Sequence, residues 1–331
     1  MMEATGVPTP PATGCTDTSA HTSVLMPKQT LSLGVVAAAL SQDPRAVPVR
    51  SRGAGFTGVQ FDAYSAALNV PELSVSGRRE FLRLLTSQDQ RLVGLRWDAG
   101  PKGLRPGTDV DQALSRLERA LEAAAGLQSP LVCVDLGPLP EPPPESKPKP
   151  KVTQEQAGLI LLPEGIGNER SNESQEQPPA GRAVDPSFAS QVDGALAELG
   201  RRADRYGTTV AFRSDLASFA ALERVLRKAN CPSFGIDLDP VALLRDAWET
   251  DEVLSRLGAQ IRHVRGRDAT AGADRRTKPA VVGQGDTNWE ELLADLDAAG
   301  YSGWITVDPI ELSDRSAAAS QAREKLAKLL L

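Results

Sequence analysis

Short apolar segments alternate with longer amphipathic segments along most of the chain. This alternation is typical of repeated strand–helix units whose strands form a parallel sheet. Eight segments have the strand pattern, because each is short and rich in Val, Ile, Leu or Phe. They are Leu31–Ala37, Gly58–Ala63, Leu92–Trp97, Leu131–Leu136, Thr208–Ser214, Ser233–Asp239, Ile261–Arg267 and Trp304–Asp308.

Helical spacing and helix-end signals appear between these strands. After Thr108, a predicted N-cap, apolar residues recur every three or four positions as far as Gly126. Residues 185–205 repeat the pattern, and Thr287–Glu290 fits a capping box that opens a further helix. A last helix is expected over residues 313–331 and should pack on the outside of the sheet.

Two segments do not fit this rhythm. Residues 1–30 are rich in Thr, Pro, Ser and Ala and lack the basic start and apolar core of a secretory signal, and Met26 is an alternative start. Residues 138–184 contain proline runs, a Lys/Pro alternation and a stretch rich in Glu, Gln, Asn and Ser. Such composition buries too little apolar surface to become ordered. Within it, we expect only Leu159–Leu162 to be able to dock.

About 250 residues remain without these segments, which is the usual size of one (β/α)8 barrel. We therefore predict an α/β fold: a TIM barrel forming a single domain over residues 31–331, preceded by a disordered segment at 1–30. A long disordered insertion at about 138–184 follows the fourth strand. It emerges at the C-terminal face, where a disordered surface loop is favoured over a lid.

Composition excludes several classes of protein. The formal net charge of −6 argues against a nucleic-acid groove, and no segment is long and apolar enough to span a membrane. The three cysteines, Cys15, Cys133 and Cys231, lack C-x-x-C spacing, and the two histidines are His21 and His263. This set indicates neither a disulfide framework nor a zinc cluster, and it favours a cytoplasmic location.

The last third of the chain carries motifs of a known family. Pro279–Asp286 contains Gly-Gln-Gly-Asp, a capped helix follows at Trp289–Leu293, and Gly300–Asp308 leads into the last strand. Ile261–Asp268 is similar to the family's strand-seven motif, and Gly55–Gln60 is similar to its turn into strand two. Together they resemble the xylose-isomerase-like sugar phosphate isomerase/epimerase superfamily, which implies a TIM barrel.

The resemblance also implies a divalent metal at the C-terminal ends of the strands. In the family, a Glu, an Asp, a His and a Glu on strands five to eight bind the ion, and the two glutamates move a proton beside the substrate carbonyl. The matching positions here are Arg213, Asp239, Arg265 and Asp308, and the family's further His falls on Ala242. Because arginine cannot ligate a metal and its charge repels one, we predict no metal and no other cofactor.

Charged residues of alternating sign end the predicted strands. Strands three, five and seven carry Arg96, Arg213 and Arg265 near their C-terminal ends, and strands two, four, six and eight carry Asp62, Asp135, Asp239 and Asp308. Alternate strands contribute the layers that fill such a barrel, so these residues should surround one mouth. Asp237 and Arg267 share the inward parity and should extend the ring.

Two interpretations of this ring remain open. In one, guanidinium–carboxylate pairs only close the barrel, and in the other the arginines replace the metal's charge and bind an anionic substrate bidentately. The candidate proton-transfer residues are Asp239 and Asp308, and the candidate substrate-binding residues are Arg96, Arg213, Arg265, Arg267 and Asp135. His263 is expected to satisfy a hydrogen bond inside the barrel.

Two further features have competing interpretations. The Gly283–Gly285 turn could present amide groups to an anion, and Arg275–Lys278 could grip a phosphate. A plain tight turn explains the first feature equally well, and a solvated charge run is the favoured explanation of the second.

The sequence therefore predicts a sugar phosphate isomerase/epimerase-like protein. It should bind a small carbohydrate-like or anionic ligand at the C-terminal face without a metal, and it should bind neither nucleic acid nor membranes. The alternative is a catalytically inactive TIM barrel that serves as a binding or scaffold protein. A DNA-repair endonuclease on the same fold is disfavoured by the acidic charge and the missing histidines.

Overall fold

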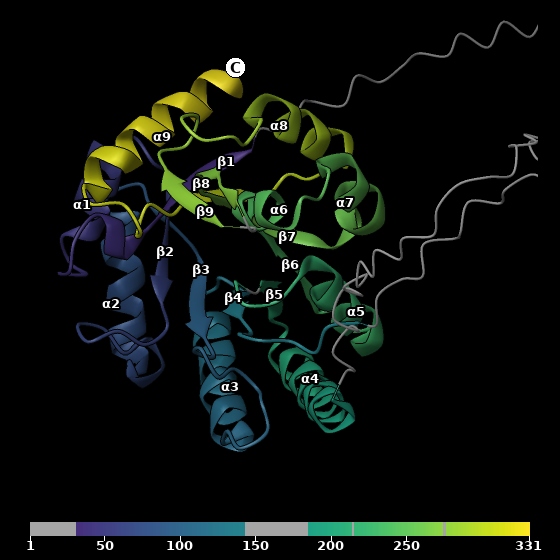
Figure 1. Cartoon of the computed structure of the whole chain (residues 1–331). Helices are drawn as coiled ribbons and strands as arrows, with labels where there is room; N and C mark the ends of the chain where they lie inside the picture. Colours follow the sequence, from purple (N-terminus) through teal and green to yellow (C-terminus); the bar gives the residue numbers. More distant parts are fainter. Residues whose placement is uncertain (1–30, 143–184, 214, 274–275) are drawn as a thin grey trace, which may run out of the picture. The chain divides into compact units, whose positions relative to one another are not determined.

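Eight parallel strands form a closed barrel inside a ring of helices (Figure 1). The structure is a computed structural model and describes residues 31–331 apart from 143–184, 214 and 274–275. Around the barrel the strands follow the order β1, β10, β7, β6, β5, β4, β3, β2, which closes on β1. They are β1 (Ser32–Val36), β2 (Gly58–Asp62), β3 (Arg91–Asp98), β4 (Leu131–Asp135), β5 (Thr209–Arg213), β6 (Phe234–Leu238), β7 (Ile261–Gly266) and β10 (Trp304–Val307). The predicted (β/α)8 barrel is confirmed.

The helices pack their apolar faces on the outside of this barrel. In α3, for example, Leu114, Leu117 and Leu121 are buried at helical spacing. Asp109 caps α3 by accepting from the Gln112 N–H, whereas the predicted cap, Thr108, donates its hydroxyl to Arg105 O. The helices are α1 (Val47–Gly53), α2 (Val75–Thr86), α3 (Val110–Gly126), α4 (Pro186–Tyr206), α5 (Phe219–Ala229), α6 (Pro240–Asp246), α7 (Thr250–Leu257), α8 (Trp289–Ala298) and α9 (Arg315–Leu329), with 3-10 turns η1 (Ala37–Ala39), η2 (Val70–Glu72) and η4 (Gly258–Gln260). None of the helices in the described part of the chain has the length and apolarity that a membrane span requires.

An antiparallel hairpin between β7 and α8 was not predicted. Its strands are β8 (Asp268–Ala271) and β9 (Thr277–Ala280), and they pair with each other rather than with the barrel. Both are short, and β9 carries only partly or fully exposed residues, so neither shows the apolar pattern of a barrel strand. The described residues of the predicted charge run 275–278 lie on or beside β9.

The region after β4 begins with packed residues, not with the predicted insertion. Pro138, Leu139 and Pro140 are buried, and the carboxylate of Glu141 accepts from the Ser218 N–H at 2.8 Å. Ser218 is the N-cap of α5, a position where a negative charge is favourable. The predicted start at 138 is therefore too early. Residues 143–184, with the Leu159–Leu162 run, and residues 1–30 lie outside the described residues.

The close approach of β3 and β4 requires a residue without a side chain at Gly94 on β3. A Cβ there would lie 2.7 Å from the carbonyl oxygen of Leu131 on β4. We expect Gly94→Ala to lower the free energy of unfolding by about 1–3 kcal/mol through this overlap. At Gly194 on α4, an added Cβ would meet nothing within 4 Å, so Gly194→Ala should stabilise by about 0.5–1 kcal/mol. Urea unfolding of both variants measures the difference, and equal effects would contradict this packing.

Candidate functional site

A chain of ion pairs crosses the C-terminal mouth of the barrel. Arg96 at the end of β3 donates its Nε to Asp62 Oδ1 and its Nη1 to Asp308 Oδ2, both at 2.8 Å. Arg265 on β7 donates its Nη1 to the same oxygen of Asp308 and its Nε to Asp237 Oδ2, both at 2.7 Å. The chain of ion pairs Asp62–Arg96–Asp308–Arg265–Asp237 thus links residues on, or directly after, the five strands β2, β3, β10, β7 and β6.

Arg213 lies at the end of β5 among three carboxylates. Its Nη2 is 3.3 Å from Asp135 Oδ2, and its Nη1 is 2.6 Å from Asp215 Oδ1 and 3.7 Å from Asp239 Oδ2. Arg213 therefore contacts more negative charge than it can neutralise by itself.

Arg267, which follows β7, completes the ring. Its Nη1 donates to Asp239 Oδ2 at 2.6 Å, and its Nη2 donates to Glu311 Oε1 at 2.9 Å. Sequence reasoning missed Asp215 and Glu311 because both lie in loops beyond the strand ends. Their position two or three residues past a ring residue is the signal that could have found them.

The pKa values of the ring carboxyls separate into two kinds. Burial raises the pKa of Asp308, but Arg96 and Arg265 outweigh that effect and hold the pKa below its ordinary value. Asp237 is fully buried, and Arg265 and His263 likewise lower its pKa. Burial raises the pKa of Asp135, and Arg213 offsets the rise only in part. Asp135 is thus a carboxyl whose negative charge is incompletely compensated.

A buried polar layer lies beneath the ring, in which most polar atoms are hydrogen-bonded and Gln60 Oε1 has no partner. His263 contacts Asp237 Oδ1 through Nδ1 at 2.6 Å and Thr306 Oγ1 through Nε2 at 2.7 Å. Gln60 donates its Nε2 to Cys133 Sγ at 3.2 Å. The expectation that His263 satisfies hydrogen bonds inside the barrel is confirmed.

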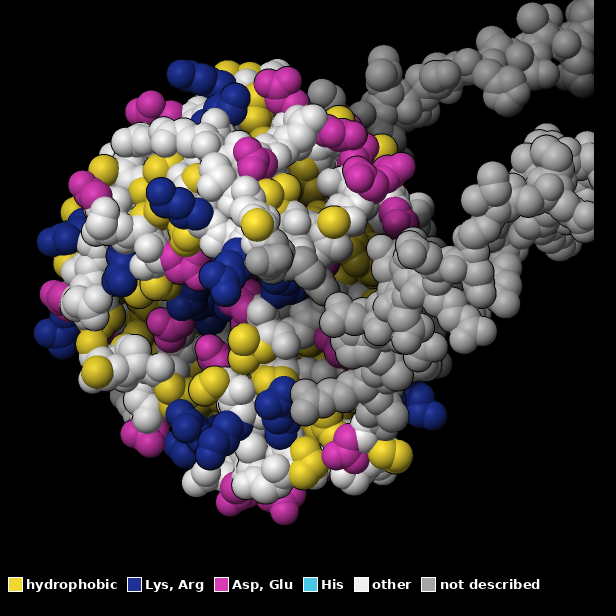
Figure 2. Space-filling model, in the orientation of Figure 1, with side chains coloured by type: hydrophobic (Ala, Val, Ile, Leu, Met, Phe, Trp, Pro, Cys, Tyr) yellow, Lys and Arg dark blue, Asp and Glu magenta, His cyan; other side chains and the backbone are white. Residues whose placement is uncertain are grey.

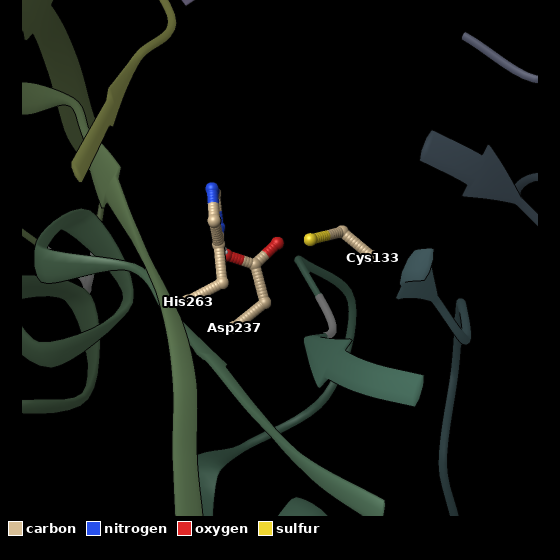
Figure 3. Close-up of side chains that lie close together, drawn as sticks. All are labelled: Cys133, Asp237 and His263. Carbon is tan, nitrogen blue, oxygen red and sulfur yellow. Dashed lines mark hydrogen bonds and ion pairs between the residues drawn. The ribbon is translucent and has the colours of Figure 1, made fainter. Parts of the chain in front are cut away.

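Three side chains of this layer have metal-ligating atoms close together. Figure 3 shows Cys133, Asp237 and His263 converging inside the barrel, and their ligand atoms lie within 4.8 Å of one another. Both nitrogens of His263 and both carboxylate oxygens of Asp237 already have partners, and burial raises the pKa of the Cys133 thiol well above its usual range. A metal would have to displace these contacts and remove the thiol proton.

The metal implied by the family resemblance does not fit the four corresponding positions. Arg213 and Arg265 supply no ligand atom, and their positive charges repel a cation. Asp239 and Asp308, the two remaining carboxylates, are each held by two arginines. In this chain the positions form ion pairs with their neighbours.

A cavity of about 230 Å³ opens at the mouth. Of the predicted substrate-binding residues, Arg96, Arg213, Arg265 and Asp135 line it, whereas Arg267 and the predicted proton-transfer residues Asp239 and Asp308 are not among its lining. The remaining lining residues are Asp62, Tyr64, Trp97, Asp98 and Arg116. Of these, Arg116 comes from helix α3 and stacks its guanidinium 4.6 Å from the centre of the Tyr64 ring, so the strand pattern gave no signal for it.

Negative charge exceeds positive charge in the ring. Its four arginines, Arg96, Arg213, Arg265 and Arg267, face seven carboxylates, which are Asp62, Asp135, Asp215, Asp237, Asp239, Asp308 and Glu311. Every ring arginine contacts at least two of them. In Figure 2, basic and acidic side chains lie side by side near the middle of the visible face. The arginines therefore carry no surplus positive charge that could replace a metal ion.

The Gly283–Gly285 turn is occupied by a side chain of the protein itself. Asp268 Oδ2 accepts from the N–H groups of Gly283 at 2.8 Å and Gly285 at 3.2 Å, and from Trp289 Nε1 at 3.2 Å. Its Oδ1 accepts from the Thr287 N–H at 3.2 Å. These contacts explain the turn as a structural element that joins the hairpin to α8.

Comparisons with known proteins agree with the fold. The family model described as "Xylose isomerase-like TIM barrel" matches residues 50–329. A solved xylose isomerase domain protein from Planctomyces limnophilus is 15% identical with a TM-score of 0.64, and the match covers 92% of this chain and 97% of that chain. No curated protein sequence matches the chain.

Two sugar epimerases are also similar in structure. D-psicose 3-epimerase with D-tagatose from Clostridium cellulolyticum H10 is 12% identical with a TM-score of 0.63, covering 91% of this chain and 99% of that chain. 3-Keto-D-glucoside 4-epimerase from E. coli is 16% identical with a TM-score of 0.60, covering 90% and 99%. At this identity the likeness shows the fold alone.

The shared carboxylate of Asp308 predicts a defined pH dependence of stability. Its pKa is lower in the folded than in the unfolded chain, so it contributes stability above about pH 4 that is lost as the pH falls further. We expect Asp308→Asn to lower the free energy of unfolding by about 3–5 kcal/mol at pH 7, because two arginines lose a charged partner. The deficit relative to the parent should shrink below about pH 4.

Asp89→Asn is the matched control for this measurement. Asp89 pairs with Arg52 at 3.4 Å on the surface, with 80% of its side chain exposed. Its loss should change stability by less than about 1 kcal/mol. Denaturant unfolding from pH 3 to pH 8 compares the variants, and a pH-independent deficit for Asp308→Asn would contradict the assignment.

Proposed function

Because the chain belongs to the family of xylose isomerase-like TIM barrels, we propose that it binds a small, uncharged, carbohydrate-like ligand in the cavity at the barrel mouth. The observation that carries the proposal is the lining of the cavity, where ion pairs hold guanidinium donors and carboxylate acceptors in fixed positions. A sugar hydroxyl both donates and accepts hydrogen bonds, so neighbouring donors and acceptors suit it. The structurally similar sugar epimerases support this class of ligand.

The cavity lining contains four arginines and three aspartates, and it is the existing pairing of Arg96, Arg213 and Arg265 that favours a neutral ligand over an anionic one. A phosphate or carboxylate group would have to compete with carboxylates that already occupy the guanidinium groups of Arg96, Arg213 and Arg265. Like charges at close range raise the cost of bringing such a group into a partly buried cavity. A hydroxyl group avoids this cost.

The contacts favour binding without the metal-dependent isomerisation that the family resemblance implies. In this proposal Asp239 and Asp308 hold the arginines in place and do not transfer a proton, because each is paired with two guanidinium groups and neither carboxylate lines the cavity. Asp135 lines the cavity, and its carboxylate can accept a hydrogen bond from a ligand hydroxyl.

The proposal predicts that the purified protein holds no stoichiometric divalent ion. Mn2+, Mg2+, Co2+ and Zn2+ should leave the Tm unchanged, because an ion that binds only the folded state would raise it. Elemental analysis and thermal melts provide the test. One ion per chain would contradict the proposal, and its loss in His263→Ala but not in Asp239→Ala would place it at the Cys133, Asp237 and His263 group.

Ligand binding is tested with ketohexoses. D-fructose, D-tagatose and D-allulose, the sugars named with structurally similar epimerases, should raise the Tm by a few degrees near saturation, since each kcal/mol shifts it by about 2–4 °C. Arg213→Ala should abolish the shift measured from the variant's own Tm. Arg224→Ala, which removes a pair with Asp193 between α4 and α5, should retain it.

The outcome separates the classes of ligand. Stabilisation by sugar phosphates but not by the free sugars would favour the anionic ligand. Stabilisation by neither would contradict ligand binding and leave the ring as a structural closure of the barrel.

A further inference from the structure

Three hollows that share walls lie around the ends of β1 and β2. The first is the mouth cavity, and the second, of about 100 Å³, shares Asp62 with it. The third, of about 690 Å³, shares Gln42, Pro44, Ala67 and Leu68 with the second and extends along α2. The side chain of Asp62 is one-third exposed, at 33%, and forms the shared wall at the mouth. The second hollow is therefore a neighbour of both the mouth cavity and the third hollow.

Their lining changes from charged in the first hollow to apolar in the third. The mouth cavity is surrounded mainly by arginines and aspartates, and the second hollow by small residues such as Ala37, Ala38 and Ala66. The third has an apolar lining, named here the outer groove, formed by Leu68, Leu73, Phe81 and Leu84. The exposed, charged side chains of Asp43, Arg45 and Glu80 also line this hollow. An apolar hollow with a polar rim is typical of a surface that a ligand covers.

We infer that the outer groove holds an apolar extension of the ligand whose polar part lies in the mouth cavity. The ligand class is a carbohydrate that carries a hydrocarbon chain, such as an alkyl glycoside. The inference rests on the proposed function for the polar part and adds the apolar part. The outer groove has three times the volume of the mouth cavity, which a free monosaccharide would leave uncovered.

In this arrangement the mouth cavity and the outer groove have separate roles in binding the ligand. Fixed donors and acceptors at the mouth select hydroxyl groups by geometry, whereas the apolar surface of the outer groove contributes affinity in proportion to the area it buries. The hollow between them is the smallest of the three, at about 100 Å³, and we expect it to take an unbranched chain. Affinity should therefore increase with the length of the hydrocarbon chain, whereas discrimination between sugars should depend on the charged residues at the mouth.

The test uses 8-anilinonaphthalene-1-sulfonate, whose fluorescence rises in apolar surroundings, as a probe of the outer groove. It should bind at one site per chain, and methyl, hexyl and octyl β-D-glucosides below their micelle concentrations should displace it. Displacement should strengthen by roughly three- to fourfold per buried methylene, or about tenfold from hexyl to octyl. Methyl glucoside should displace little of the probe.

Two tryptophan variants locate the effect. Ala67 is exposed and lines both the second and third hollows, so Ala67→Trp should fill their junction and remove the chain-length dependence. Val75 is 68% exposed at the start of α2 and lines none of the three hollows. Val75→Trp adds the same bulk and should behave as the parent does.

The outcomes distinguish this inference from the proposed function. Chain-length-dependent displacement without any ketohexose stabilisation would uphold the outer groove and contradict the neutral sugar at the mouth. Ketohexose stabilisation with displacement independent of chain length, or Ala67→Trp matching Val75→Trp, would overturn the outer groove. A molar mass that rises with protein concentration while probe binding falls would assign the outer groove to a second copy of the chain and overturn the inference.

Discussion

The carboxylate of Asp308 accepts hydrogen bonds from two guanidinium groups, and the mouth of the barrel depends on this shared acceptor. Arg265 is 2% exposed, so its charge is tolerable only because Asp308 and Asp237 pair with it from either side. Arg96 uses the same oxygen of Asp308 and connects β3 to β10 across the barrel. A change at this one acceptor therefore affects strands that share no ladder, and the positions of the cavity walls depend on it.

The sequence was sufficient to predict the barrel and the ring residues that lie on its strands and point inward. Period-two alternation along Asp237–Asp239 and His263–Arg267 fixes which side chains point inward, and the strand ends place them in one layer. It was not sufficient for Asp215, Glu311 and Arg116, because a loop or helix residue reaches the cavity through tertiary packing that no local period encodes. Asp215 and Glu311 enlarge the excess of carboxylates that the predicted ring residues already have, whereas Arg116 adds a positive charge to the cavity lining.

A family barrel can keep its fold while the chemistry at its mouth changes. The barrel is held together by strand pairing and by the apolar contacts between strands and helices, and neither depends on which charged residues end the strands. Arg213 and Arg265, at positions that the family resemblance matches to metal ligands, instead contact carboxylates of the chain itself.

The carboxylate of Asp268 joins the β8–β9 hairpin to the turn that follows it and to the start of α8. It accepts from the amide groups of Gly283, Gly285 and Thr287 and from the indole of Trp289, and it stands at the first residue of β8. The β8–β9 hairpin, the following turn and the start of α8 consequently share one buried anchor. Local unfolding of this region is then cooperative: the hairpin cannot detach from the barrel without also releasing the first turn of the helix, so the three segments open and close as one unit.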